Sequence, residues 1–94
     1  APILECVQPQ QNGSYTAYFG YRNNNNAAID IPIGAHNRFS PGPQERGQPS
    51  LFHPGRTAHY PDEAFQVVFD GYPLVWTLNG QTATASNNPA QICS

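Results

Sequence analysis

Two tight-turn signals inside one apolar stretch, Ala64 to Ser86, constrain the fold of this chain more than any other feature. Asp70-Gly71 and Asn79-Gly80 divide the stretch into three runs that alternate with a period of two: 65–69, 74–78 and 82–86. Asp-Gly and Asn-Gly suit the positive φ angles of two-residue hairpin turns, and such alternation is typical of strands with one buried face. The stretch therefore predicts a three-stranded antiparallel meander.

Five further segments have the composition or alternation of strands: Ile3–Val7, Ser14–Arg22, Ala27–Ile33, Arg38–Ser40 and Ser50–His53. Asn23–Asn26 joins the second and third of these, and we expect a hairpin there because Asn tolerates left-handed backbone. Seven or eight short strands at spacings of about 8–12 residues are the pattern of a β-sandwich. We therefore expect one all-β domain over residues 1–94, an immunoglobulin-like Greek-key sandwich, with a small β-barrel as the alternative.

The expected core follows from the same alternation. Trp76, the only tryptophan, is placed at its centre, and Ala83 and Ala85 provide a small face against which the indole can lie. The other expected core residues are Ile3 or Leu4, Tyr15, Phe19, Ile29, Ile31, Phe65, Val67, Phe69, Leu74 and Leu78.

Composition excludes several classes of function. The net charge of −2 favours neither nucleic acid nor an anionic membrane as partner. All four basic residues are Arg, so the chain can form no lysine isopeptide bond, Schiff base or P-loop. No apolar run approaches the roughly 20 residues of a membrane span. Because the chain begins at Ala1 and contains no Met, we expect a processed product or an excised piece.

The two cysteines, Cys6 and Cys93, lie near opposite ends of the chain. A metal site needs clustered ligands and a redox site needs a close pair, and neither pattern is present. The spacing favours a disulfide that joins the first and last strands, either within one chain or between two chains. Such a bond indicates an oxidising, extracellular compartment.

No residue pattern indicates catalysis or a cofactor. The three histidines, His36, His53 and His59, match no metal-ligand spacing, and no nucleophile elbow accompanies them. The only adjacent acidic pair is Asp62-Glu63, which we interpret as solvated. We therefore expect no enzyme activity, no cofactor and no metal site.

Exposed aromatic and basic residues are the candidates for ligand binding. Three tyrosines, Tyr18, Tyr60 and Tyr72, lie outside the expected core and suit stacking on sugar rings or anchoring of a protein partner. Three of the four arginines lie in the segment Gly34–Glu63, directly before the meander: Arg38, Arg46 and Arg56. They suit acidic groups on a partner, although we favour internal ion pairs with Glu45, Asp62 and Glu63.

Four blocks of sequence resemble a small module that recurs in secreted and cell-surface proteins of bacteria, often as one unit of a long multidomain chain. The blocks are Cys6–Tyr21 with its NGSYTAYFGY, FSPGPQERGQP (39–49), FHPGR (52–56) and FDGYPLVWTLNGQTATAS (69–86). The resemblance covers nearly the whole chain. It implies a non-catalytic extracellular domain and carries over no catalytic residue.

From these observations we expect an extracellular structural or adhesive module on the cell surface. Its partners would be further copies of itself or neighbouring extracellular domains. One version is a filament subunit in which the N-terminal strand, Pro2–Val7, completes the sheet of the next copy. The alternative, from another class, is a carbohydrate-binding module that holds polysaccharide through the exposed tyrosines.

Overall fold

The computed structural model describes all 94 residues and is all-β apart from one short 3₁₀ turn. Its elements are β1 (Pro2–Pro9), β2 (Tyr15–Asn23), β3 (Ile29–Asp30), β4 (Asn37–Ser40), β5 (Leu51–Phe52), β6 (Gly55–Arg56), β7 (Phe65–Phe69), β8 (Leu74–Leu78), β9 (Gln81–Ala85) and η1 (Pro89–Gln91). No helix in the structure has the length and apolar character needed to cross a membrane.

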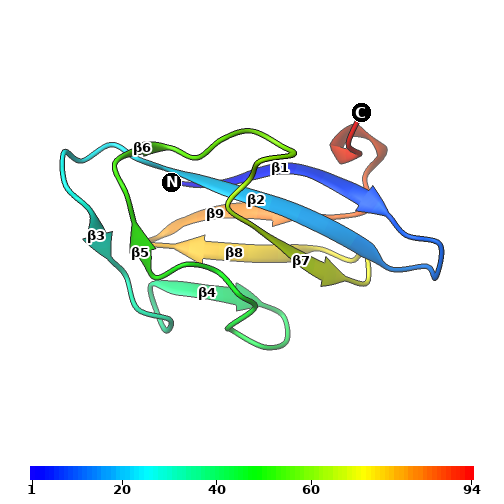
Figure 1. The fold of residues 1–94 in the computed structure, drawn as a ribbon. Coiled ribbons are helices and arrows are strands. Elements are labelled where there is room, and N and C mark those ends of the chain that lie inside the picture. The colour runs from blue at the N-terminus through cyan, green and yellow to red at the C-terminus, as the bar shows by residue number, and fades with distance from the viewer.

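Two sheets lie one over the other (Figure 1). In the first, β2 pairs with β1 along one edge and with both β6 and β7 along the other. In the second, β8 lies between β4 and β9, and a separate short ladder joins β3 to β5. The sheets do not close on themselves, so the architecture is the predicted small β-sandwich and not the alternative barrel.

The predicted meander is correct in its second half and wrong in its first. β8 and β9 form the expected hairpin, with Asn79 at φ 52° and Gly80 at φ 84° in its turn. β7, however, pairs with β2 in the opposite sheet. Asp70-Gly71 therefore connects the two sheets, and the Asp70 carboxylate accepts a hydrogen bond from the N–H of Tyr72 at 2.9 Å. Alternation shows that β7 has one buried face, but it does not specify the strand with which β7 pairs.

The hairpin expected around Asn23–Asn26 is also wrong, because β3 pairs with β5 and not with β2. The buried side chain of Asn23 explains the departure of the chain from β2. Its Nδ2 donates to the carbonyls of Ala27 and Phe52 at 3.1 and 2.9 Å, and its Oδ1 accepts from the N–H of Asn25 at 2.9 Å. The amide thus closes a compact loop where a hairpin would need a continuing ladder.

The core surrounds Trp76, which is fully buried and packs on aromatic rings from several strands. Its ring lies parallel to that of Phe39, with centroids 5.8 Å apart, and perpendicular to that of Phe65 at 5.0 Å. Twelve buried residues form this core: Val7, Ala17, Phe19, Tyr21, Phe39, Phe52, Val67, Phe69, Leu74, Trp76, Leu78 and Ala85. Of the residues expected there, Leu4, Tyr15, Ile31, Phe65 and Ala83 are only partly buried against it.

Five core residues were not among those expected, namely Val7, Ala17, Tyr21, Phe39 and Phe52. Ala17 and Tyr21 lie on β2, on the same face as Phe19. Phe39 and Phe52 lie in strands too short to display an alternation. Val7 is buried because the register of β1 shifts between Leu4 and Cys6. This bulge lets Leu4 and Val7, three residues apart, face the same core.

The Cys6–Cys93 disulfide forms within one chain, with Cα atoms 4.9 Å apart. The segment after η1 lies beside β1, and the N–H of Cys93 donates to the carbonyl of Val7 at 2.9 Å. In Figure 1 the C-terminus accordingly lies next to β1. The first strand is thus bonded covalently to the segment that follows the last strand.

One buried amide holds the tryptophan in place. Asn37, on β4, is completely buried. Its Oδ1 accepts a hydrogen bond from Trp76 Nε1 at 3.0 Å, and its Nδ2 donates to the carbonyls of Ile31 and Pro49 at 2.9 and 2.8 Å. The side chain therefore satisfies three groups from separate parts of the chain.

We predict that Asn37→Ala lowers the free energy of unfolding by about 3–5 kcal/mol, because it leaves these three buried groups without partners. Denaturant unfolding followed by Trp76 fluorescence measures the change. Asn26→Ala, at an exposed position, is the control and should shift stability by less than about 0.5 kcal/mol. Equal unfolding midpoints for the two variants would contradict this role of Asn37.

Candidate functional site

Tyr18 lies on the outer face of the first sheet, where β2 places it between Cys6 on β1 and Gln66 on β7. Its ring contacts that of Tyr60 edge to face, with centroids 4.7 Å apart. Burial of the hydroxyl raises the pKa of Tyr18 above its usual value, and the nearby Tyr60 and Glu63 raise it further. Tyr18 therefore presents a neutral phenol at physiological pH. Two of the three predicted tyrosines thus form one aromatic pair.

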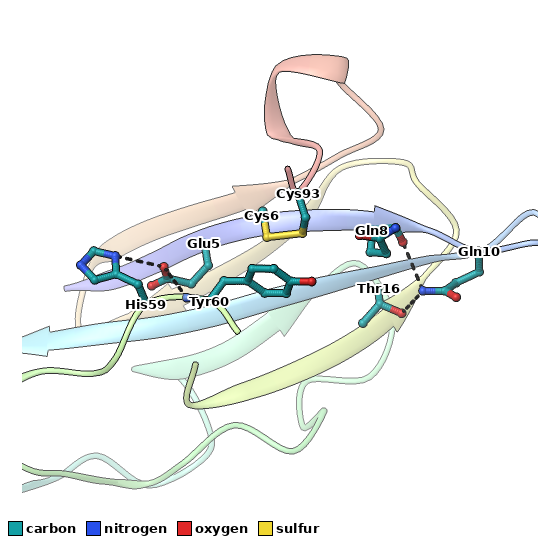
Figure 2. The surroundings of a disulfide bond; sticks show 8 residues. All are labelled: Glu5, Cys6, Gln8, Gln10, Thr16, His59, Tyr60 and Cys93. Atoms are coloured by element: carbon teal, nitrogen blue, oxygen red, sulfur yellow. Dashed lines mark hydrogen bonds and ion pairs between the residues drawn. A yellow bond between two sulfur atoms is a disulfide. The ribbon is translucent and has the colours of Figure 1, made fainter. Parts of the chain in front are cut away.

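Tyr60 reaches this position on a segment, residues 57–64, that crosses the outer face between β6 and β7. One carboxylate, Glu5, holds the segment (Figure 2). Its side chain is only 5% exposed, and its Oε2 lies 2.8 Å from Arg56 Nη2. Glu5 Oε1 accepts a hydrogen bond from the N–H of Tyr60 at 3.4 Å and lies 3.6 Å from His59 Nδ1.

Local sequence explains how this segment packs so closely on the sheet. The bulge in β1 directs both Glu5 and Cys6 to the outer face. Gly20, opposite on β2, has no side chain, and a Cβ there would collide with the side chains of Thr57 and Glu5. Thr57 Oγ1 in turn accepts from the N–H of Tyr21 at 2.9 Å. Glu5 was not among the predicted site residues, because the bulge that orients it has no local signal in the sequence.

The arginines do not form the expected ion pairs with Glu45, Asp62 and Glu63. Arg56 pairs with Glu5 instead. Arg46 donates to the backbone carbonyls of Pro41 and Pro43 at 2.6 and 3.2 Å, which closes its own loop. Arg38 is exposed on β4 and makes no ion pair. The one arginine ion pair is therefore with Glu5, which is far from Arg56 in sequence, and not with the nearby acidic residues that we expected.

The predicted ligand-binding residues fall into separate places. Tyr72 is 73% exposed and lies in the connection between β7 and β8. Together with Arg46 it lines a small pocket of ≈ 160 Å³ beside Pro41 and Asp70. Tyr18, Tyr60 and Arg56 instead gather over the first sheet, and Arg38 belongs to neither group. The six residues therefore do not make one site.

A shallow groove of ≈ 830 Å³ runs over the outer face of the first sheet at the hairpin end of β1 and β2. It has no charged residue and is lined by Pro9, Gln10, Gln11, Asn12, Ser14, Thr16, Tyr18, Gln66 and Val68. Gln10 Nε2 donates to Thr16 Oγ1 at 3.0 Å, as Figure 2 shows, which fixes one amide at the rim. Tyr18 is the only predicted ligand-binding residue in this groove, because the other residues come together through strand pairing.

No group of three His, Cys, Asp or Glu side chains is arranged to hold a metal ion. Of the three histidines, His59 contacts Glu5, and His53 contributes only its backbone N–H to the hydroxyl of Tyr21 at 3.1 Å. No protein-family model, curated protein or solved structure matches this chain.

Proposed function

We propose that this domain is a non-catalytic extracellular structural module that spaces or displays its neighbours on a cell surface. Those neighbours are other extracellular domains or further copies of the chain. The open β-sandwich supports the assignment, and the proposal includes an immunoglobulin-like order in which β1-β2-β7 would be strands A-B-E and β4-β8-β9 strands C-F-G. The disulfide supports the compartment, because such bonds persist where the medium is oxidising.

The observation that carries this proposal is the position of the disulfide. Cys6 and Cys93 are 87 residues apart in sequence, and their Cα atoms are 4.9 Å apart in space. Tension applied between the two ends of the chain passes from one cysteine to the other through the sulfur atoms. The residues between them bear no load, so the domain transmits force without lengthening. Exchange of β1 between copies would require this bond to break, and it is therefore not part of the proposal.

We predict that the oxidised domain, pulled from its two ends within a tandem polyprotein, shows no unfolding step that lengthens the chain appreciably. Reduction, or the pair Cys6→Ser and Cys93→Ser, should restore a step of about 300 Å, the extended length of the 87-residue span. Single-molecule force spectroscopy measures both. A long extension step in the oxidised protein would contradict a load-bearing role.

The groove favours carbohydrate binding as a second function. Amide and hydroxyl side chains both donate and accept hydrogen bonds, as sugar hydroxyls do. Tyr18 adds an aromatic ring and a neutral phenol at the centre of the sheet. Because no charged residue lines the groove, the chemistry fits a neutral polysaccharide better than an acidic one.

Affinity electrophoresis tests this second function on gels that contain dextran, soluble starch, hydroxyethyl cellulose, galactomannan or alginate. We expect retardation on at least one neutral polymer and none on alginate. Tyr18→Ala should weaken binding by about tenfold or more. Tyr72→Ala, which changes an exposed tyrosine outside the groove, is the control and should leave it unchanged. Mobility unaffected by every neutral polymer, or unaltered retardation of Tyr18→Ala, would overturn the carbohydrate function.

A further inference from the structure

The outer edges of the two sheets are protected unequally. The edge of β1 is covered by the C-terminal segment, since the carbonyl of Val7 accepts from the N–H of Cys93 at 2.9 Å. Pro2 and Pro9, at the two ends of the strand, have no N–H to offer. These features oppose the pairing of another strand with the full length of this edge.

Loops bond along the edge of β4, and one side chain bonds to the C-terminal end of the edge of β9. On β9, the side chain of Gln91 imitates a peptide group. It donates to the carbonyl of Thr84 at 3.1 Å and accepts from the N–H of Ser86 at 2.8 Å. On β4, the N–H of Phe39 donates to the carbonyl of Gln44 at 2.9 Å, and Asn37 exchanges two backbone bonds with Gly34 at 3.1 and 3.0 Å.

β7 is the exception, because it pairs with β2 along one edge and has no strand along the other. The N–H of Gln10 donates a hydrogen bond to the carbonyl of Ser14, so the even-numbered residues at this end of β2 bond to β1. Because backbone groups alternate in direction along a strand, residues 15, 17 and 19 of β2 bond to β7. The outward backbone groups of β7 therefore belong to Gln66 and Val68. Neither residue has a backbone partner at this edge.

The sequence of β7, FQVVF, contains none of the devices that protect an exposed strand edge. It has no charge, no proline and no bulge, and the side chain of Val68 is 64% exposed. A flat, uncharged edge with free N–H and C=O groups is a template for a further strand. The edges of β1, β4 and β9 are each bonded at one or more positions, whereas neither outward residue of β7 has a partner, so β7 offers the most open edge for an interaction.

We propose that β7 pairs antiparallel with β7 of a second copy of this chain, around a two-fold axis at Val67. In this register Gln66 lies opposite the partner's Val68, and Val68 opposite the partner's Gln66. Each pair exchanges two backbone bonds, so the two pairs make four. The strand is its own complement, because its free groups match under the two-fold rotation and no like charges meet.

Pairing would also extend the core across the axis. The inward side chains Phe65, Val67 and Phe69 would continue onto those of the partner, which covers the half-buried Phe65. The first sheets would become one sheet of double width with β7 at its centre. This inference adds self-association to the structural role proposed above, and it uses none of the cysteines on which that role rests.

Sedimentation of the oxidised full chain from micromolar to millimolar concentration tests the proposal, and we expect a monomer–dimer equilibrium. Val68→Lys should raise the dissociation constant by more than about tenfold, because a lysine on the edge opposes pairing. Thr84→Lys is the matched control, an exposed strand position on the covered β9 edge, and should leave the equilibrium unchanged. Circular dichroism shows that each variant keeps the fold.

Amide exchange locates the interface. We expect the N–H groups of Gln66 and Val68 to gain protection as the concentration rises, while that of Thr82 on β9 does not. A chain that stays monomeric throughout the range would overturn the proposal, as would a dimer that Val68→Lys does not weaken. The force-spectroscopy result does not depend on self-association. A chain that fails to dimerise would therefore overturn this inference without contradicting the load-bearing role.

Discussion

The disulfide between Cys6 and Cys93 is the constraint on which the arrangement of this small sandwich depends. A chain of this length buries only a modest share of its unfolded surface, so a covalent link between its ends adds stability that a small core lacks. In the chain-entropy model a loop of 87 residues contributes about 4.5 kcal/mol. The same bond holds the C-terminal segment along β1, which closes one side of the sandwich. It thus serves stability and edge protection together, and in the proposed structural role it would also transmit force.

Besides this covalent link, two buried side chains join distant parts of the chain through hydrogen bonds and an ion pair. Asn37 bonds the indole of Trp76 to two loop carbonyls in the core. Glu5 bonds Arg56 and the backbone of Tyr60 on the outer face, and so places Tyr60 against Tyr18. One anchor thus lies in the core and the other on the outer face of the first sheet. What remains exposed there is an uncharged groove and the open edge of β7, which are the two surfaces available for recognition.

The sequence predicted local features well and non-local ones poorly. Alternation and turn chemistry identified β8, β9 and the Asn79-Gly80 turn, since these depend on neighbours in the chain. The partner of β7 was wrong because the choice between β8 and β2 depends on packing, which a period of two does not encode. Glu5 and Asn37 carried no signal, because a bulge and a long-range contact determine their roles. Of the candidate site, only Tyr18, Tyr60 and Arg56 come together, through contacts between residues far apart in sequence.

The intrachain disulfide is the bond on which the proposed extracellular role rests. Alkylation of the protein recovered from its source, unfolded in denaturant and analysed by mass spectrometry, tests this claim most directly. We expect that neither Cys6 nor Cys93 reacts before reduction and that both react afterwards, in a protein of monomeric mass. Two free thiols before reduction, or a disulfide-linked chain of higher mass, would contradict it.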